Sequence, residues 1–110
     1  MESREIPKQD WQSYFDIHFK GPSSKSVKLE ILSMEYGDQT EDNWGHLKGL
    51  SYDPKDDKFC LFIDHLNHYI SHPSRISVLE EGTSINAIEI EDGTGNKQII
   101  YLKDPTMLSN

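Results

Sequence analysis

The stretch from Lys48 to Arg75 constrains the fold more than any other part of the sequence, because it holds a strong turn signal between two apolar segments. Within the turn, Pro54 presets φ, and the neighbouring aspartates can hydrogen bond to the backbone locally. The apolar run KFCLFI at residues 58–63 is short, which favours a strand buried on both faces. We therefore predict a β-hairpin in which residues 47–53 and 58–63 flank a turn at 54–57.

Pro73 restricts the backbone of the segment that follows. Residues 68–81, HYISHPSRISVLEE, have the composition of an extended strand. Pro73 lacks an N–H group and disfavours helical angles at His72. Since a proline inside a strand belongs at an edge or a bulge, we expect one strand that bends near residues 72–74.

A helix is predicted near the N-terminus, after residues 1–5, which we expect to be a frayed end. Pro7 suits the first turn of a helix, where its missing N–H is not needed. The segment GPSSKS should end this helix near residues 19–20. Four side chains share one face at helical spacing and should cover one side of a sheet: Trp11, Tyr14, Phe15 and His18.

The remaining strands are predicted from alternation and from turn residues. Val27, Leu29 and Ile31 alternate with polar residues in the segment 26–36, which is typical of a half-buried strand. Gly37 and Asp38 mark a turn or a bulge. Residues 85–91 and 97–103 flank DGTGN, a glycine-rich hairpin loop.

These elements predict an α+β fold that is mainly β. One N-terminal helix is followed by about six short antiparallel strands, which favour a curved sheet or a partly open small barrel. The 110 residues are enough for one domain, with an ordered core at about 6–105 and short flexible termini.

The charge of the chain bears on its partners. The formal net charge is −8, from 19 acidic and 11 basic residues. Nucleic acids and anionic lipids are bound mainly through clustered Lys and Arg, which release counterions. The bases are scattered here, so we expect no nucleic-acid partner and no membrane partner. An RNA-binding barrel of the Sm type is disfavoured for the same reason.

The compartment is inferred from what the sequence lacks. Cys60 is the single cysteine, so no intrachain disulfide can form. The N-terminal residues contain no apolar stretch of the kind found in secretory signals. No apolar run approaches the roughly 18 residues that a membrane-spanning helix needs. We expect a soluble cytoplasmic protein.

Several motifs together resemble a known family. They are IPxxxWxxxF at 6–15, GDQ at 37–39, LxGLSYDPKDD at 47–57, HxIxHP at 68–73 and DP at 104–105. The pattern is similar to that of an uncharacterised family of small bacterial domains of unknown function, over roughly residues 6–105. The resemblance implies a bacterial or archaeal origin and a stand-alone domain, without a catalytic assignment. His65 is this chain's addition to the family's His68 and His72.

A metal site at His65, His68 and His72 is a weaker alternative. Three histidines with an open coordination position are typical of catalytic zinc. However, at about 3.3 Å per residue, two histidines four residues apart in a strand lie roughly 13 Å apart. We therefore expect the histidines to bond locally or to line a partly wet groove, and we predict no metal and no cofactor.

The other reactive residues have structural explanations. DPKDD at 53–57 lacks the glycine and glutamate of a calcium-binding EF-hand loop, so a solvated turn is expected. Cys60 lies between Phe59 and Leu61 and is predicted to be a small core residue. We find no nucleophile elbow, zinc-protease, P-loop or dinucleotide-binding motif, and we assign no catalytic residue.

The function is therefore unknown from sequence, and a non-enzymatic interaction or accessory domain is the preferred hypothesis. Its candidate binding groove comprises His68, His72, Pro73 and Trp44, and its partner would be another protein or a second copy that pairs at a sheet edge. The alternative is a small metal-dependent or general-base enzyme that uses His68 and His72.

Overall fold

The computed structural model describes residues 2–19, 24–33, 37–40, 44–64, 66–82 and 84–104. In these ranges the chain forms one short helix and a nine-stranded sheet. The elements are β1 (Glu2–Ile6), η1 (Lys8–Asp10), α1 (Trp11–His18), β2 (Ser26–Ser33), β3 (Gly37–Thr40), β4 (Gly45–Asp53), β5 (Lys58–Ile63), β6 (Leu66–Ser71), β7 (Arg75–Glu81), β8 (Ser84–Glu91) and β9 (Lys97–Lys103).

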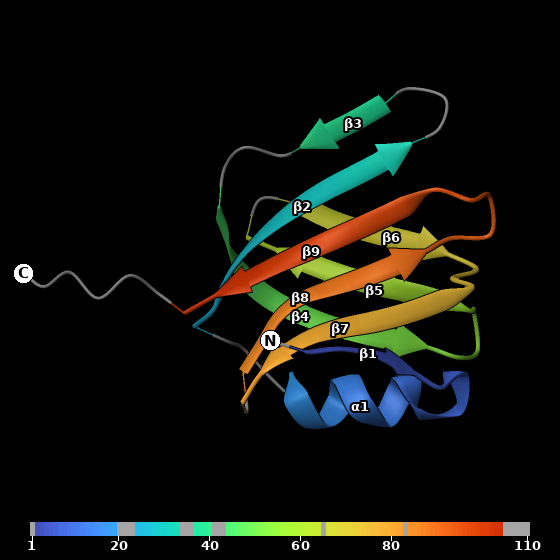
Figure 1. Ribbon diagram of the computed structural model, residues 1–110, viewed down its shortest axis with the longest axis horizontal. Helices are drawn as coiled ribbons and strands as arrows, with labels where there is room; N and C mark the ends of the chain where they lie inside the picture. Colours follow the sequence, from blue (N-terminus) through green and yellow to red (C-terminus); the bar gives the residue numbers. More distant parts are fainter. Residues whose placement is uncertain are drawn as a thin grey trace, which may run out of the picture.

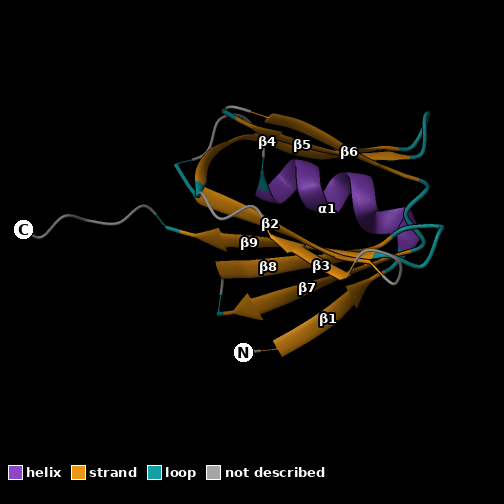
Figure 2. Ribbon diagram, turned by 90° about the horizontal axis from the view of Figure 1, so that it is seen from above, coloured by secondary structure: helices purple, strands orange, loops and turns teal. Residues whose placement is uncertain are grey.

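The sheet curves back on itself into two layers (Figures 1 and 2). The order of its strands is β1-β7-β8-β9-β2-β4-β5-β6, and β3 pairs with β2 outside this path. We call β1-β7-β8-β9-β2 the large layer and β4-β5-β6 the small layer. The layers join where β2 and β4 pair, at Ser26–His46 and Val27–Gly45. Since the described strand pairs are antiparallel, the α+β, mainly β prediction is confirmed.

The core lies between the two layers. Along β5 and β9 every second side chain is buried, because successive residues of a strand point to opposite faces. The inner faces supply mainly branched aliphatic residues and two large aromatic groups. The side chains from the strands with the least exposure are Val27, Leu47, Phe59, Leu61, Ile70, Ile76, Val78, Ile88, Ile90 and Ile100.

Helix α1 closes the opening between the layers along one side, at the bottom of Figure 1. Phe15 is fully buried, and its ring lies 5.1 Å from the ring of Phe59, nearly perpendicular to it. The indole N–H of Trp11 donates to the carbonyl of Ile6 at 2.8 Å, so this buried polar atom is satisfied. The predicted helical stripe is confirmed for Trp11, Tyr14 and Phe15, whereas His18, assigned to the same face, is exposed. The outward side chain of Ile17 is 76% exposed.

Two predictions about the strands are wrong. Residues 1–5 were expected to fray, but residues 2–6 form β1, which pairs with β7 from Glu2–Glu80 to Ile6–Ile76. Only Ile6 of this strand is buried, so its sequence carries no apolar alternation. Backbone pairing holds the strand, together with the ion pairs Arg4–Glu80 and Glu5–Arg75. The predicted turn or bulge at Gly37 and Asp38 is the start of β3.

The predicted single bent strand at 68–81 is two strands in different layers. β6 pairs with β5, and β7 pairs with β1 and β8. The chain crosses from one layer to the other at residues 72–74. His72 has φ 53°, in the left-handed region, rather than the extended angles expected before a proline.

The segment 58–63 also differs from its prediction. It forms β5, but only Phe59, Leu61 and Ile63 are buried, and the alternate side chains lie on the outer face. The predicted hairpins around 54–57 and around DGTGN are confirmed. Within the described ranges, no helix combines the length and apolarity needed to cross a bilayer.

Replacement of Phe15 by alanine should lower the free energy of unfolding by about 3–5 kcal/mol, because it leaves a cavity between α1 and β5. Replacement of Ile17 by alanine, on the exposed face of the same helix, should change it by less than about 0.5 kcal/mol. Urea unfolding followed by tryptophan fluorescence measures both. Equal effects of the two substitutions would contradict the position of α1.

Candidate functional site

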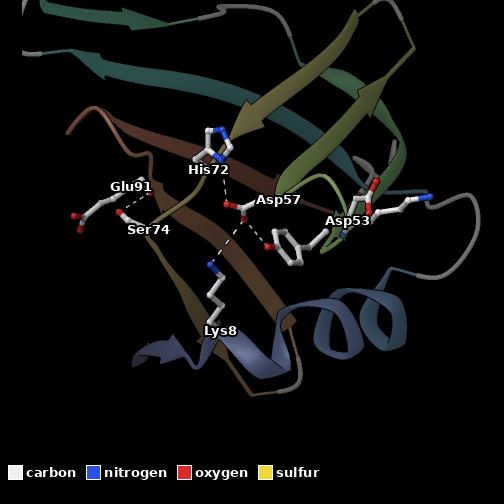
Figure 3. A network of polar contacts seen from close by, with 8 residues as sticks. Lys8, Asp53, Asp57, His72, Ser74 and Glu91 are labelled. Atoms are coloured by element: carbon white, nitrogen blue, oxygen red, sulfur yellow. Dashed lines mark hydrogen bonds and ion pairs between the residues drawn. The ribbon is translucent and has the colours of Figure 1, made fainter.

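A cluster of polar side chains surrounds Asp57, where the β4–β5 turn meets the crossing between β6 and β7 (Figure 3). The hydroxyl of Tyr52 donates to Oδ1 of Asp57 at 2.5 Å. Nδ1 of His72 lies 3.1 Å from Oδ2 of the same carboxylate. The Lys8 ammonium, from η1, lies 4.0 Å from Oδ1. One carboxylate therefore connects the turn, the crossing and the start of the helical region.

The backbone explains why these residues meet. Asp57 and His72 are the non-glycine residues with positive φ in the described part of the chain, at 51° and 53°. Asp and His tolerate this left-handed conformation better than most residues. The N–H of His72 donates to the carbonyl of Asp57 at 2.8 Å. The pairing of Lys58 with Ser71 brings the turn beside the crossing.

The electrostatics of the cluster favour an ionised Asp57. Its pKa lies below the ordinary value of 3.8, because the hydroxyl of Tyr52 and the ring of His72 hydrogen bond to the charged carboxylate. Burial, together with the hydrogen bond to Asp57, raises the pKa of Tyr52 to about 12. Tyr52 therefore remains a hydrogen-bond donor to Asp57 throughout the physiological pH range.

The β8–β9 connection packs against the same crossing. Ser74 donates from its backbone N–H to the carbonyl of Glu91 at 2.7 Å and from its hydroxyl at 3.0 Å. A Cβ atom on Gly93 would lie 3.3 Å from the carbonyl oxygen of His72, so a larger residue would crowd the crossing. Asp92 holds the loop by accepting hydrogen bonds from the backbone of Thr94 and Asn96.

The pair of Asp57 and His72 has the geometry of an oriented imidazole. A carboxylate on one ring nitrogen leaves the other able to accept a proton, as in general-base catalysis. The side chain of His72 is 76% exposed, so solvent reaches it. The described contacts of Asp57 are with Tyr52, His72 and Lys8, which belong to β4, the crossing and η1. Asp57 therefore also has a structural role, because it links these three parts of the fold.

His68 occupies a different environment from His72. It lies on the inner side of β6 and is half-buried, with Nε2 2.6 Å from Oε1 of Gln98 on β9. Gln98 is itself buried and 8% exposed. The two histidines of the predicted groove thus have separate partners, one inside the sandwich and one outside it.

Trp44 and Pro73 complete the predicted groove residues. Trp44 lies just before β4, and its ring is 4.1 Å from the ammonium of Lys103 and 5.4 Å from that of Lys28. Pro73 is buried in the crossing, next to His72. Trp44 therefore accompanies the large layer, whereas His72 and Pro73 belong to the crossing.

The weaker metal alternative included His65, which lies outside the described residues. Across the ranges that the structure describes, no group of three or more His, Cys, Asp or Glu side chains could hold a metal ion. In the turn at 53–57, Oδ1 of Asp53 accepts the backbone N–H of Lys55 at 3.0 Å. The carboxylates of Asp53 and Asp57 both bond within the chain.

Cys60 does not lie in the core, as the sequence suggested. It is half-buried on the outer face of β5, because its neighbours Phe59 and Leu61 take the inward positions. Burial raises the pKa of its thiol, which keeps it in the less nucleophilic form. The apolar run at 58–63 predicted a buried Cys60, but the outer face of β5, on which Cys60 lies, is directed toward solvent.

A surface that the sequence analysis missed lies on the outer face of the large layer. A depression of about 170 Å³ opens there, away from α1. We call this surface the outer β-face, with Leu79, Ala87, Ile99 and Tyr101 at its centre. The depression is lined by Ser3, Ser77, Val78, Leu79, Ala87, Glu89, Ile99 and Tyr101.

The signal for the outer β-face is the run Ile99–Leu102 in β9. Ile100 and Leu102 are buried on the inner side, while Ile99 and Tyr101 point outward and stay half-exposed. An antiparallel sheet with one solvated face normally alternates apolar and polar residues. The apolar run in β9 therefore indicates a strand that carries apolar side chains on both faces of the sheet.

Charges around the outer β-face are paired with one another. Lys97 lies 3.3 Å from Glu89, and Arg75 lies 3.3 Å from Glu5 and 3.6 Å from Glu91. Leu79, Ala87 and Tyr101 lie in one row of the sheet, and Ile99 lies in the next row between Glu89 and Glu30, so charged side chains border the apolar groups. Such an arrangement is typical of a protein–protein interface, with an apolar core and a polar rim.

Comparison with known proteins identifies relatives without a described activity. The profile described as "Family of unknown function (DUF5335)" matches residues 2–110. An "Uncharacterized protein" of Aquifex aeolicus (strain VF5) is 42% identical over 104 residues, which cover 94% of each chain. No solved structure matches the chain significantly.

Replacement of Asp57 by alanine should lower the free energy of unfolding by about 2–3 kcal/mol, because the partners lose a charged acceptor and alanine resists positive φ. Asparagine tolerates positive φ and keeps one acceptor oxygen, so its cost should be nearer 1 kcal/mol. Urea unfolding at neutral pH measures the free energies of unfolding of the wild type and the two variants, which should fall in the order wild type, Asp57→Asn, Asp57→Ala. Equal stability of all three proteins would contradict a structural role for Asp57.

The contribution of Asp57 should also depend on pH. Its folded pKa is lowered, so its stabilisation is present above the ordinary value of 3.8 and is lost as the pH falls through the folded pKa. The stability difference between the protein and its Asp57→Asn variant should therefore be constant above about pH 5 and shrink below pH 4. Urea unfolding at several pH values tests this, and a difference that grows in acid would contradict it.

Proposed function

This chain belongs to the family of unknown function DUF5335, and we propose that it acts as a non-enzymatic interaction domain in the cytoplasm. Its partner is a second copy, which packs on the outer β-face. The observation that carries this proposal is the strand β9, whose residues Ile99–Leu102 are apolar toward both faces of the sheet. The helix α1 covers only the inner side, so Ile99 and Tyr101 stay partly exposed and available for contact with another molecule.

The distribution of charge favours a second copy over other partners. The chain carries a net charge of −8, so two copies repel one another unless they meet at a surface where charges cancel. The outer β-face provides such a surface, because Lys97 and Arg75 are paired with neighbouring glutamates. A strongly acidic or strongly basic partner would gain little from it.

The arrangement of the face also suits two-fold symmetry. Lys28 and Lys103 lie on the β2 and β9 side, around Trp44, whereas Glu5 lies on β1 at the opposite margin. A two-fold axis along β8 would place β2 and β9 of one copy over β1 and β7 of the other. Leu79 of one copy would then face Tyr101 of the other near the axis, because both residues share a row of the sheet with Ala87.

Replacement of Ile99 by lysine should convert a dimer to a monomer, because a charge would be buried at the centre of the interface. Ile17→Lys is the matched control, since it makes the same chemical change at a position on α1 that is 76% exposed. Sedimentation velocity should give twice the 12.7 kDa chain mass for the wild type and for Ile17→Lys.

The Ile99→Lys variant should sediment as a single chain and retain the circular dichroism of the wild type. A wild type that remains monomeric at the highest soluble concentration would refute the proposal. Equal dissociation by both lysine substitutions would refute the assignment to the outer β-face.

A second candidate function, general-base or metal-assisted catalysis, is supported by the 3.1 Å contact between His72 and Asp57. Calorimetric titration with zinc, nickel and manganese separates it from the first. Stoichiometric binding that is lost in both His68→Ala and His72→Ala would favour catalysis. Binding that is absent, or unchanged in both variants, would remove the metal-assisted form of this candidate.

A further inference from the structure

The strand β6 forms one edge of the sheet. It ends the strand order on the side of the small layer, and it pairs with β5 from Lys58–Ser71 to Ile63–Leu66. No other described strand pairs with it. The backbone groups on its other side therefore have no strand partner within the described ranges. An unpaired edge of this kind can accept an additional strand.

β6 also lacks the protection that natural edge strands carry. Its sequence, LNHYIS, contains no Asp, Glu, Lys or Arg. The edge strand β1 at the other end of the sheet contains Glu2, Arg4 and Glu5 in five residues. Charged side chains on an edge strand discourage pairing with other chains. Among the edge strands whose side chains are described, β6 is the one suited to pairing.

Apolar groups near β6 are only partly covered. Leu66 of β6 and Ile31 of β2 pack against the core but remain half-exposed. Gln98, which pairs with Ile31 in the sheet, reaches across the interior to His68 at 2.6 Å. On the opposite side, α1 closes the sandwich with Trp11 and Phe15. A strand added to β6 would cover Leu66 further.

We infer that β6 binds an extended segment of a partner protein by strand addition. The six residues of β6 span about 20 Å, which sets the length of the bound segment at about six residues. The middle of that segment should be uncharged and alternate in hydrophobicity, because alternate side chains would face Leu66 and the solvent in turn.

The ends of the bound segment should be basic. Acidic residues outnumber basic ones by 19 to 11, and one of these acids, Asp56, lies in the turn that is brought beside one end of β6 by the pairing of Lys58 with Ser71. Lys or Arg residues flanking the apolar segment would complement these acids. This site is separate from the outer β-face and does not depend on dimer formation.

Selection from a displayed library of random peptides of about ten residues tests the inference. The target is the wild-type protein, and the edge-blocked variant is Asn67→Lys/Ser71→Lys, which adds lysines to exposed positions of β6. The control variant, Gln12→Lys/Ser13→Lys, adds the same charge to exposed positions of α1.

Selected peptides should have an uncharged alternating centre with basic flanks. Their affinity should fall at least about tenfold, or 1.4 kcal/mol, in the edge-blocked variant and stay unchanged in the control. Bound peptide should slow hydrogen exchange of β6 amides. No enrichment, equal affinity for both variants, or slowed exchange confined to another strand would overturn the inference.

Two further outcomes separate this site from the dimer. The Ile99→Lys variant should bind the selected peptides as tightly as the wild type, whether or not the wild type is a dimer. If exchange of the β6 amides instead slows with protein concentration alone, a second copy occupies the edge, and the inference of a peptide segment is wrong.

Discussion

The fold depends on the contact between Asp57 and His72, which fixes where the chain leaves the small layer and enters the large one. The crossing at 72–74 is too short to be guided by packing alone, and both residues adopt positive φ to achieve it. A backbone hydrogen bond of 2.8 Å and a side-chain contact of 3.1 Å hold them together. The motifs YDPKDD and HxIxHP, on which the family resemblance rests, meet at this contact. Most of their polar groups are therefore used in folding, which turns attention to the surfaces that folding leaves uncovered.

Two such surfaces follow from the way in which the sheet curves. Its two layers share one interior, and α1 closes one side of that interior with Trp11 and Phe15. The helix cannot also cover the outer side of β9, where Ile99 and Tyr101 point outward. Nor does it cover Leu66 of β6, which is only partly buried. The outer β-face suits a second folded copy because it is broad, and the β6 edge suits an extended segment because it is narrow and offers backbone groups.

Local signals predicted much of the fold. The hairpin around 54–57 and the buried helix positions Trp11, Tyr14 and Phe15 were predicted correctly, because turn chemistry and periodicity act within a few residues. β1 was missed because an edge strand with one buried residue shows no apolar alternation, and its ion pairs join it to the distant residues Glu80 and Arg75. The division of 68–81 into β6 and β7 depends on the distant Asp57, so Pro73 alone could indicate only a bend. The apolar run at 58–63 was predicted to be buried on both faces, but only its inner face is buried. The apolar run in β9 carries outward-facing apolar side chains, which were not recognised from the sequence.

The central claim is that the outer β-face is the surface on which this protein associates. NMR spectra of methyl-labelled protein over a dilution series test it most directly, because each buried or exposed methyl group reports on its own surroundings. Resonances of Leu79, Ala87 and Ile99 should move together with concentration while those of Ile17 stay fixed. Resonances of the outer β-face that do not change with concentration, or changes confined to Ile17 and its neighbours, would contradict it.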